Sequence, residues 1–173
     1  LSFSTVTKTI NQFQEEDLII EDSRVSESRL GRRPTLLRIN PEGCYVIGVD
    51  IDVLHTTIAL LNLNGRIVKK IEFPTNTKVK PEVVFNLISE KINMLIDDFH
   101  EETGYKDKIL GVGIAAPLKI DYKTGIGSWS ANLGWRNIPI KSIIKEACGL
   151  ETYVEDDTKA MTIGEFWFGS ARH

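Results

Sequence analysis

Metal-binding and disulfide patterns are absent from this sequence of 173 residues. Its two cysteines, Cys44 and Cys148, lie far apart, and neither belongs to a Cys-x-x-Cys motif. The three histidines, His55, His100 and His173, are scattered and do not have the spacing of metal ligands. We therefore expect two buried, reduced thiols, a cytoplasmic protein, and no metal or other cofactor in this stretch.

Long apolar runs are also missing. No window approaches the ~18 uninterrupted apolar residues of a membrane span, and the opening LSFSTVTKTI lacks the cationic and then apolar order of a signal peptide. The net charge of −3 does not by itself indicate a nucleic-acid binder. The remaining composition, 42% hydrophobic and 26% charged, predicts one globular domain, with or without a small module, and no membrane partner.

Positive charge is concentrated in residues 24–38, which hold five arginines and one acid, Glu27. On charge alone, a solvated loop and a phosphate-contacting segment are equally compatible with this run. The segment before it predicts a helix, because Val6, Ile10 and Phe13 recur at helical spacing and a serine can cap its start. The opposite face carries small or hydrogen-bonding residues and no acid: Ser4, Thr5, Thr7, Lys8 and Asn11.

Short strand signals flank the basic run, LIIED at 18–22 and TLLRI at 35–39. The order helix, strand, basic loop, strand is typical of a winged helix. A polar-faced helix alone is usually just a surface helix, but this context makes it a candidate recognition helix.

Asn40-Pro41-Glu42-Gly43 marks a boundary, after which the pattern changes. Apolar runs predict strands at 44–51, 56–63 and 66–73, the last two joined by an Asn64-Gly65 hairpin turn. A helix begins at Pro81 and has an apolar face made of Val84, Leu87, Ile88, Ile92, Leu95 and Ile96. The segments that follow predict a strand, a helix, a strand and a helix: 109–117, 139–149, 151–156 and 158–169.

This order predicts an α/β protein with one mixed sheet covered by helices, as in actin-like and ribonuclease-H-like folds. The aromatic residues of FWFG, Phe166, Trp167 and Phe168, are expected in the core rather than stacked on a sugar. Asp156 and Asp157 follow a strand directly and have three interpretations. The first interpretation is a catalytic base with a helper, the second is a pair of sugar-hydroxyl acceptors, and the third is a pair of charges at a helix N-terminus.

Four segments resemble, in order, the ROK family of repressors, open reading frames and sugar kinases. They are LGRRPTLLRINPEGCYVIGVDI, GVGIAAPLKID, SANLGWRNIPIKSII and YVEDDTKAMTIGEFWFGSAR, and the resemblance covers essentially the whole chain. The GRRP link resembles the repressor branch, which contains xylose and N-acetylglucosamine repressors. The resemblance implies a partial winged helix-turn-helix in residues 1–40, followed in 41–173 by the N-terminal lobe of a sugar-kinase-like domain.

The resemblance also locates the phosphate loop, which in ROK kinases reads Asp-x-Gly-x-Thr. Here Asp50 is kept, but Asp52 stands at the glycine position and Leu54 at the hydroxyl position. A carboxylate repels phosphate, and a side chain blocks the close backbone approach that glycine allows. We therefore expect a degenerate loop, no ATP binding and no enzyme activity.

The sugar side resembles the family more closely. Asn132 matches its sugar-binding asparagine and Asp157 its catalytic base, while Asp156 and Lys159 replace two asparagines. Without a positioned phosphoryl donor a base has no transfer to assist, so Asp157 is expected to be a vestigial base that accepts a hydrogen bond from sugar, next to Asp156. Lys159 is expected to neutralise Asp156.

The implied function is a sugar-responsive transcriptional regulator, a repressor of a carbohydrate-utilisation operon with a weak preference for xylose. Its implied partners are operator DNA, a small sugar and further copies of itself in a homodimer or higher oligomer. The helix face named above and the wing residues Arg32 and Arg33 would contact DNA. The alternatives are an ATP-dependent sugar kinase and an interaction domain with vestigial sites. The family's second lobe, which carries a structural zinc, is expected to be missing from what looks like a fragment.

Overall fold

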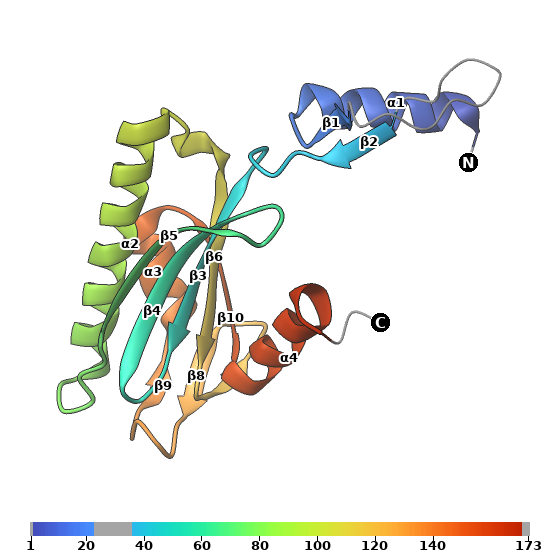
Figure 1. The fold of residues 1–173 in the computed structure, drawn as a ribbon. Coiled ribbons are helices and arrows are strands. Elements are labelled where there is room, and N and C mark those ends of the chain that lie inside the picture. Colours follow the sequence, from blue (N-terminus) through green and yellow to red (C-terminus); the bar gives the residue numbers. More distant parts are fainter. Residues whose placement is uncertain (1, 23–35, 171–173) are drawn as a thin grey trace.

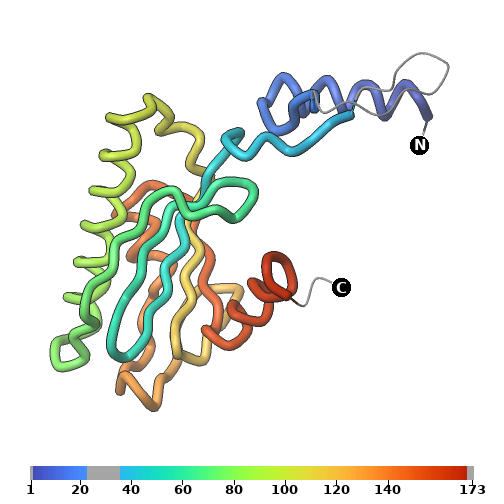
Figure 2. Tube along the Cα trace, viewed as in Figure 1, coloured from blue at the N-terminus to red at the C-terminus, as the bar shows by residue number. Residues whose placement is uncertain are grey.

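The computed structural model describes residues 2–22 and 36–170. Figure 1 shows two groups of elements. A small group, formed by α1 (Phe3–Glu15), β1 (Ile19–Asp22) and β2 (Leu36–Ile39), stands away from a larger sheet and its helices. The chain passes from one group to the other once, after β2, as the trace in Figure 2 makes clear.

Helix α1 begins where the sequence predicted a serine cap. The Ser2 side chain accepts a hydrogen bond from the Thr5 backbone N–H at 3.2 Å. The helix ends in a Schellman motif, in which the Leu18 N–H bonds to the Phe13 carbonyl at 2.8 Å. The two predicted strands that follow pair antiparallel, from Ile19 opposite Ile39 to Asp22 opposite Leu36.

The larger group is built on a five-stranded sheet with the order β10-β6-β3-β4-β5. Strands β3, β4 and β5 form the predicted antiparallel meander, and β6 and β10 run parallel to β3. The bounds are Tyr45–Ile51 for β3, His55–Asn62 for β4, Ile67–Pro74 for β5, Ile109–Ala116 for β6 and Glu151–Asp156 for β10. Parallel neighbours need long crossovers, and α2 (Pro81–Thr103) and α3 (Ile140–Cys148) supply them.

The core lies between the sheet and α2, which runs along one face in Figure 1. Strand β3 alternates: Ile47 and Val49 are buried toward α2, while Val46 and Asp50 face the other side. The predicted apolar face of α2 is confirmed apart from Leu87, which is more than a third exposed. Two fully buried aromatic residues of this helix, Phe85 and Phe99, were not predicted. The ring of Phe99 packs against Tyr45 of β3, and that of Phe85 packs against Trp135.

A three-stranded sheet, β7-β8-β9, lies between β6 and α3 in the chain and was not predicted. Its strands are Lys119–Asp121, Ile126–Trp129 and Arg136–Ile138. Runs of three or four residues are too short for alternation to show. Next comes α3, which ends as predicted at Gly149 in the left-handed conformation, with φ 69°.

Helix α4 (Asp157–Phe168) lies on the opposite side of the sheet from α2 (Figure 1). The expectation that Phe166, Trp167 and Phe168 belong to the core is wrong, since each is about 60% exposed or more. The helix turns only small residues such as Ala160 and Gly164 inward, so its large side chains face outward. Phe168 still lies so close to the β4–β5 turn that a Cβ on Gly65 would come within 2.6 Å of its ring.

Both cysteines are free thiols, Cys44 buried as expected and Cys148 only half-buried. Burial raises the pKa of the Cys148 thiol to about 11. Within residues 2–22 and 36–170 no cluster of three or more metal-ligating side chains occurs. None of the helices described is long and apolar enough to cross a membrane.

The pairing of β6 with β10 predicts different outcomes for two glycines on the same strand. A Cβ on Gly111 would come within 2.6 Å of the Glu151 carbonyl oxygen, whereas one on Gly113 would meet nothing within 4 Å. Gly111→Ala should therefore lower the free energy of unfolding by about 1–3 kcal/mol. Gly113→Ala should change it by less than about 1 kcal/mol. Urea denaturation of both variants checks this, and equal effects would contradict the close approach.

Candidate functional site

The parallel strands β3, β6 and β10 end at the same edge of the sheet. Asp50 of β3 lies opposite Ala115 of β6, and Asp156 of β10 lies opposite Ala116. The loop after β3 and the start of α4 therefore meet at this edge, which we call the acidic edge and define as Asp50, Asp52, Asp156 and Asp157. In α/β sheets with parallel strands, the carboxyl ends are where ligands bind.

Three acids of this edge, Asp50, Asp52 and Asp157, lie close enough for their charges to interact. Burial first, and then the negative charges of Asp52 and Asp157, raise the pKa of Asp50 above its ordinary value. The charges of Asp50 and Asp157 therefore interact, although the two residues are far apart in the sequence. The edge thus concentrates negative charge, which is unfavourable for binding a phosphate group.

The turn between β3 and β4 already uses part of its own backbone. The Asp52 N–H donates to the His55 carbonyl at 3.0 Å, and the Val53 N–H donates to the Asp52 carboxylate at 2.6 Å. Leu54 is two-thirds exposed, and its carbonyl accepts from the Thr75 N–H at 2.9 Å. A phosphate cradle needs free amide groups that point at the ligand. Two of the amides in this turn are instead satisfied within it.

Asp156 is the N-cap of α4. One of its carboxylate oxygens accepts from the backbone N–H groups of Thr158 at 3.1 Å and Lys159 at 3.3 Å. Asp157, the first residue of the helix, accepts from the Thr158 N–H at 2.7 Å. Of the three interpretations of the pair, the helix N-terminus accounts for Asp156. It leaves Asp157 as the acid whose charge acts on Asp50.

Lys159 does not neutralise Asp156, and that expectation is wrong. Its ammonium group pairs with Glu155 at 3.2 Å, four residues earlier. Only its backbone N–H reaches Asp156. Glu155 and Lys159 are four residues apart, so their side chains meet on one face. Asp156 is the N-cap, so its carboxylate accepts from the backbone N–H of Lys159 instead.

Asn132 lies exposed in the turn between β8 and β9. This turn is held by Ser130, whose hydroxyl accepts from the Leu133 N–H at 3.1 Å and whose N–H donates to the Trp135 carbonyl at 3.0 Å. Trp135 is buried, with its ring 5.6 Å from that of Phe85. The hydrogen bonds of the described residues do not link Asn132 to the acidic edge. Buried Ser130 organises the turn and was missed, because a single serine gives no periodic signal.

Helix α1 presents its predicted polar face to solvent. Ser4, Thr7, Lys8 and Asn11 line one surface groove, together with Phe3, Gln12 and Glu15. Thr5 is not part of it, and its hydroxyl lies 2.8 Å from that of Ser2 at the cap. Arg32 and Arg33 lie outside the described residues.

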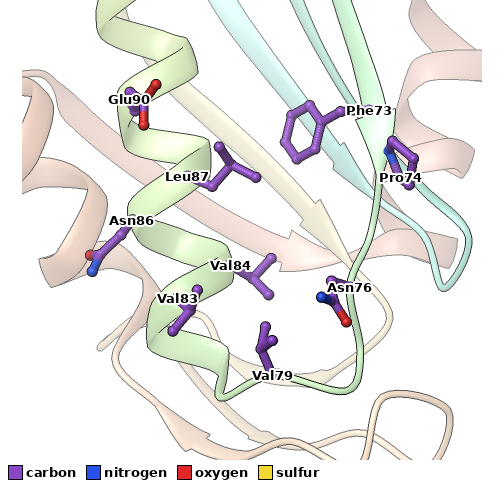
Figure 3. A pocket seen from close by; sticks show the side chains of 9 residues that line it. All are labelled: Phe73, Pro74, Asn76, Val79, Val83, Val84, Asn86, Leu87 and Glu90. Atoms are coloured by element: carbon purple, nitrogen blue, oxygen red, sulfur yellow. The ribbon is translucent and has the colours of Figure 1, made fainter.

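An apolar hollow of about 380 Å³ lies between the end of β5 and the first turns of α2. Figure 3 shows Phe73, Val84 and Leu87 directed into it. Its full lining is Phe73, Pro74, Asn76, Val79, Val83, Val84, Asn86, Leu87 and Glu90. No sequence pattern indicated it. Its lining offers few hydrogen-bonding groups for sugar hydroxyls, so the acidic edge remains the better candidate site.

Comparison with known proteins gives two kinds of relative. The chain is 30% identical over 174 residues to the xylose repressor of Caldicellulosiruptor bescii, an alignment that covers 98% of this chain and 41% of that protein. It is 33% identical over 128 residues to the glucokinase of Thermotoga maritima, covering 73% of this chain and 38% of that enzyme. The chain thus spans less than half the length of these relatives.

The fold is also shared. The crystal structure of a ROK family transcriptional regulator, a homologue of the E. coli MLC protein, superimposes with a TM-score of 0.75 at 22% identity. That superposition covers 97% of this chain and 41% of the regulator. The ROK family model matches residues 46–173, which include the whole five-stranded sheet except Tyr45. The chain therefore belongs to the ROK family.

Proposed function

We propose that this chain is part of a sugar-responsive transcriptional repressor of a carbohydrate-utilisation operon. The observation that carries the proposal is the extent of the similarity. The alignment with the xylose repressor includes nearly the entire chain, whereas that with the glucokinase covers 73% of it. The ROK family model begins at residue 46, after α1, β1 and β2. The segment that precedes the lobe thus has its counterpart in repressors.

The DNA-binding part of the proposal rests on α1. The groove on its exposed face carries Ser4, Thr7, Lys8 and Asn11, and its one acid, Glu15, lies at the C-terminal end of the helix. The four polar residues suit contacts to phosphates and base edges in the major groove. Thr5 lies beside the N-cap and suits a phosphate contact. Arg32 and Arg33 remain proposed contacts of the segment between β1 and β2. Two copies of the helix in a homodimer would read two half-sites of an operator.

The sugar-binding part rests on the acidic edge and on Asn132. A carboxylate accepts hydrogen bonds from sugar hydroxyls, and an amide both donates and accepts. Asp157 would bind sugar without acting as a base for transfer. Asp156 would contribute the carboxylate oxygen that the helix cap leaves available. Because the alignments cover less than half of the relatives, this edge is proposed as one wall of a larger pocket.

The second candidate, an ATP-dependent sugar kinase, is favoured by the glucokinase relatives. Against it stand the charge of Asp50, Asp52 and Asp157 and the internally bonded turn at Asp52 and Val53. Phosphoryl transfer depends on positioning and stabilising phosphate charge, and negative charge at this place opposes both.

The two candidates predict different results for the natural protein that contains this chain. Titration of fluorescent operator DNA, followed by anisotropy, should show tight binding that weakens at least tenfold when xylose or another sugar of its operon is added. Higher salt should weaken binding steeply, because phosphate contacts dominate affinity. A coupled assay should detect no ADP formation from ATP and the same sugar. Sugar-dependent ATP turnover without DNA binding would overturn the proposal.

Replacing Asp157 by asparagine tests the sugar site. The change removes a charged hydrogen-bond acceptor worth roughly 1.5–3 kcal/mol, so about tenfold or more sugar should be needed to release DNA. DNA affinity without sugar should not change. Asp98→Asn on the exposed side of α2 is the matched control and should leave both values unaltered. An unaltered sugar response in Asp157→Asn would show that the pocket lies elsewhere.

Asp50 predicts an unusual dependence of stability on pH. Its raised pKa means that ionising Asp50 costs the folded state stability. Asp50→Asn should therefore raise the free energy of unfolding at pH 7, and this gain should disappear as the pH falls through the raised pKa toward the ordinary value of 3.8.

Asp121 gives a control of opposite sign. Hydrogen bonds from Thr124 and from the Lys123 backbone lower the pKa of Asp121. Its charged form stabilises the fold above the ordinary pKa, and that stabilisation is lost as the pH falls through the lowered one. Asp121→Asn should thus be destabilising at pH 7. Urea denaturation at pH 7 and at pH values down past the ordinary pKa of 3.8 checks both variants, and a loss of stability in both at pH 7 would contradict the clustering of acids around Asp50.

A further inference from the structure

Three segments that are far apart in the sequence meet where the small group of elements joins the larger one. They are the turn after α1 at Asp17, the linker after β2, and Lys108, which directly precedes β6. The Lys108 ammonium group lies 2.8 Å from the Asp17 carboxylate and donates to the Glu42 carbonyl at 3.2 Å. The Asn40 amide donates to both the backbone carbonyl and the carboxylate of Asp17, at 2.8 and 2.9 Å.

The backbone conformation of Asp17 shows what its side chain contributes to these contacts. Asp17 has φ 59°, the left-handed conformation that ends the Schellman motif of α1 and is usually occupied by glycine. An aspartate there is less favourable for the backbone than glycine. What it adds is the carboxylate, whose pKa the hydrogen bond and the charge of Lys108 hold below the usual value.

Close packing at the linker leaves little freedom for this turn. A Cβ on Gly43 would clash with the carbonyl oxygen of Asp17. Lys108 is also restrained from its other side, because its ammonium group lies 4.4 Å from the centre of the Tyr105 ring. An isolated surface ion pair contributes little to stability. Here the ion pair has two further polar contacts, an aromatic ring and a tight backbone approach, so its geometry is defined.

We call the contact formed by Asp17, Asn40, Glu42 and Lys108 the joint. Strand β6 connects this joint to the acidic edge. It begins at Ile109, immediately after Lys108, and ends at Ala116, opposite Asp156. Figure 1 shows the strand running the length of the sheet from the linker side to the α4 side. Strand β6 pairs with β10 in unbroken register from Gly111 to Ala116, and its pairing with β3 shifts register only between Ile109 and Val112, next to Lys108. A shift at the acidic edge therefore reaches the Lys108 end of the strand through a continuous hydrogen-bonded ladder.

We propose that Lys108 is a positioning residue that sets the direction of α1 relative to the sheet through Asp17. The inference that this direction controls operator binding rests on the function proposed above. Without the joint, the crossing after β2 would leave α1 free to swing about residues 40–43. With it, the small group follows the start of β6.

Spin labels test the joint without DNA or sugar. Cysteines introduced at Thr9 on α1 and Glu101 on α2, both exposed, carry the labels in the full chain. Cys44 is buried and the pKa of Cys148 is about 11, so both native thiols react slowly at neutral pH. The protein without introduced cysteines measures any background labelling. Pulsed dipolar spectroscopy should give one narrow distance distribution for the parent protein.

Lys108→Met and Asp17→Gly should each at least double the width of that distribution. Asp17→Gly is the more demanding variant, because it relaxes the backbone of the turn and removes only the carboxylate, so α1 should remain helical by circular dichroism. Lys108→Arg keeps a cation that can donate to both Asp17 and Glu42, so it should preserve the narrow distribution. Lys106→Met is the matched control, since Lys106 is a nearby exposed lysine that pairs with Asp97 on α2 at 3.7 Å.

A narrow distribution in both Lys108→Met and Asp17→Gly, or equal broadening in Lys106→Met, would overturn the proposal. Operator titrations then test its regulatory half. The ratio of DNA dissociation constants with and without sugar should fall toward one in Lys108→Met and keep its parent value in Lys108→Arg. If the parent protein does not bind DNA at all, the proposed function fails while the spin-label result still decides the joint. If DNA and sugar bind but the ratio is unchanged in a variant with a broad distribution, α1 direction is not what sugar controls.

Discussion

The parallel pairing of β3 with β6 and of β6 with β10 is the constraint on which the rest of the structure depends. It requires the crossovers through α2 and α3, and these helices bury one face of the sheet. It also makes the three strands end together, which is why Asp50 and Asp157 share one environment. The same alignment places the opposite ends of these strands toward the linker, where Lys108 meets Asp17. The positions of the acidic edge and of Lys108 at opposite ends of the sheet are thus consequences of one pattern of hydrogen bonds.

Most of the larger elements could be predicted because burial leaves a periodic trace. The strands beginning at Tyr45 and Ile109 are nearly continuous apolar runs, and α2 repeats its apolar residues at helical spacing. The sheet β7-β8-β9 left no such trace, since its strands are short and owe their conformation to Trp135 and Ile138 in the core. Local pattern predicts an element only when the element is long enough to repeat.

Around the candidate site, the side-chain arrangement differs from the expectations for Lys159 and Phe166, and both differences have physical causes. That Asp50, Asp52 and Asp157 come together follows from the order of the strands, so it was accessible from the sequence. The predicted pairing of Lys159 with Asp156 was wrong because Asp156 caps the helix through backbone N–H groups, while the Lys159 side chain reaches Glu155. The predicted burial of Phe166 was wrong because helical spacing indicates which residues share a face but not whether other elements cover that face. Contacts such as that of Asp17 with Lys108, which are 91 residues apart, leave no local pattern at all.

The two roles of the acids at the edge also differ in how they tolerate change. Asp156 works through a helix cap that several residue types can supply, whereas the effect of Asp157 on Asp50 needs a charge. A substitution that preserves the fold at this edge therefore need not preserve its electrostatics.

The burial of Trp135 gives the molecule an optical property. An indole shielded from water emits at shorter wavelength than an exposed one, and Trp135 lies in the core directly after the turn that carries Asn132. Trp167, on the exposed side of α4, lies in a polar environment instead. Trp129 of β8, which is 47% exposed, also emits at longer wavelength than Trp135. The blue component of the emission spectrum consequently belongs to Trp135, whereas the red component is shared by β8 and α4. A shift of the blue component would report motion of the turn beside Asn132 in the unlabelled protein.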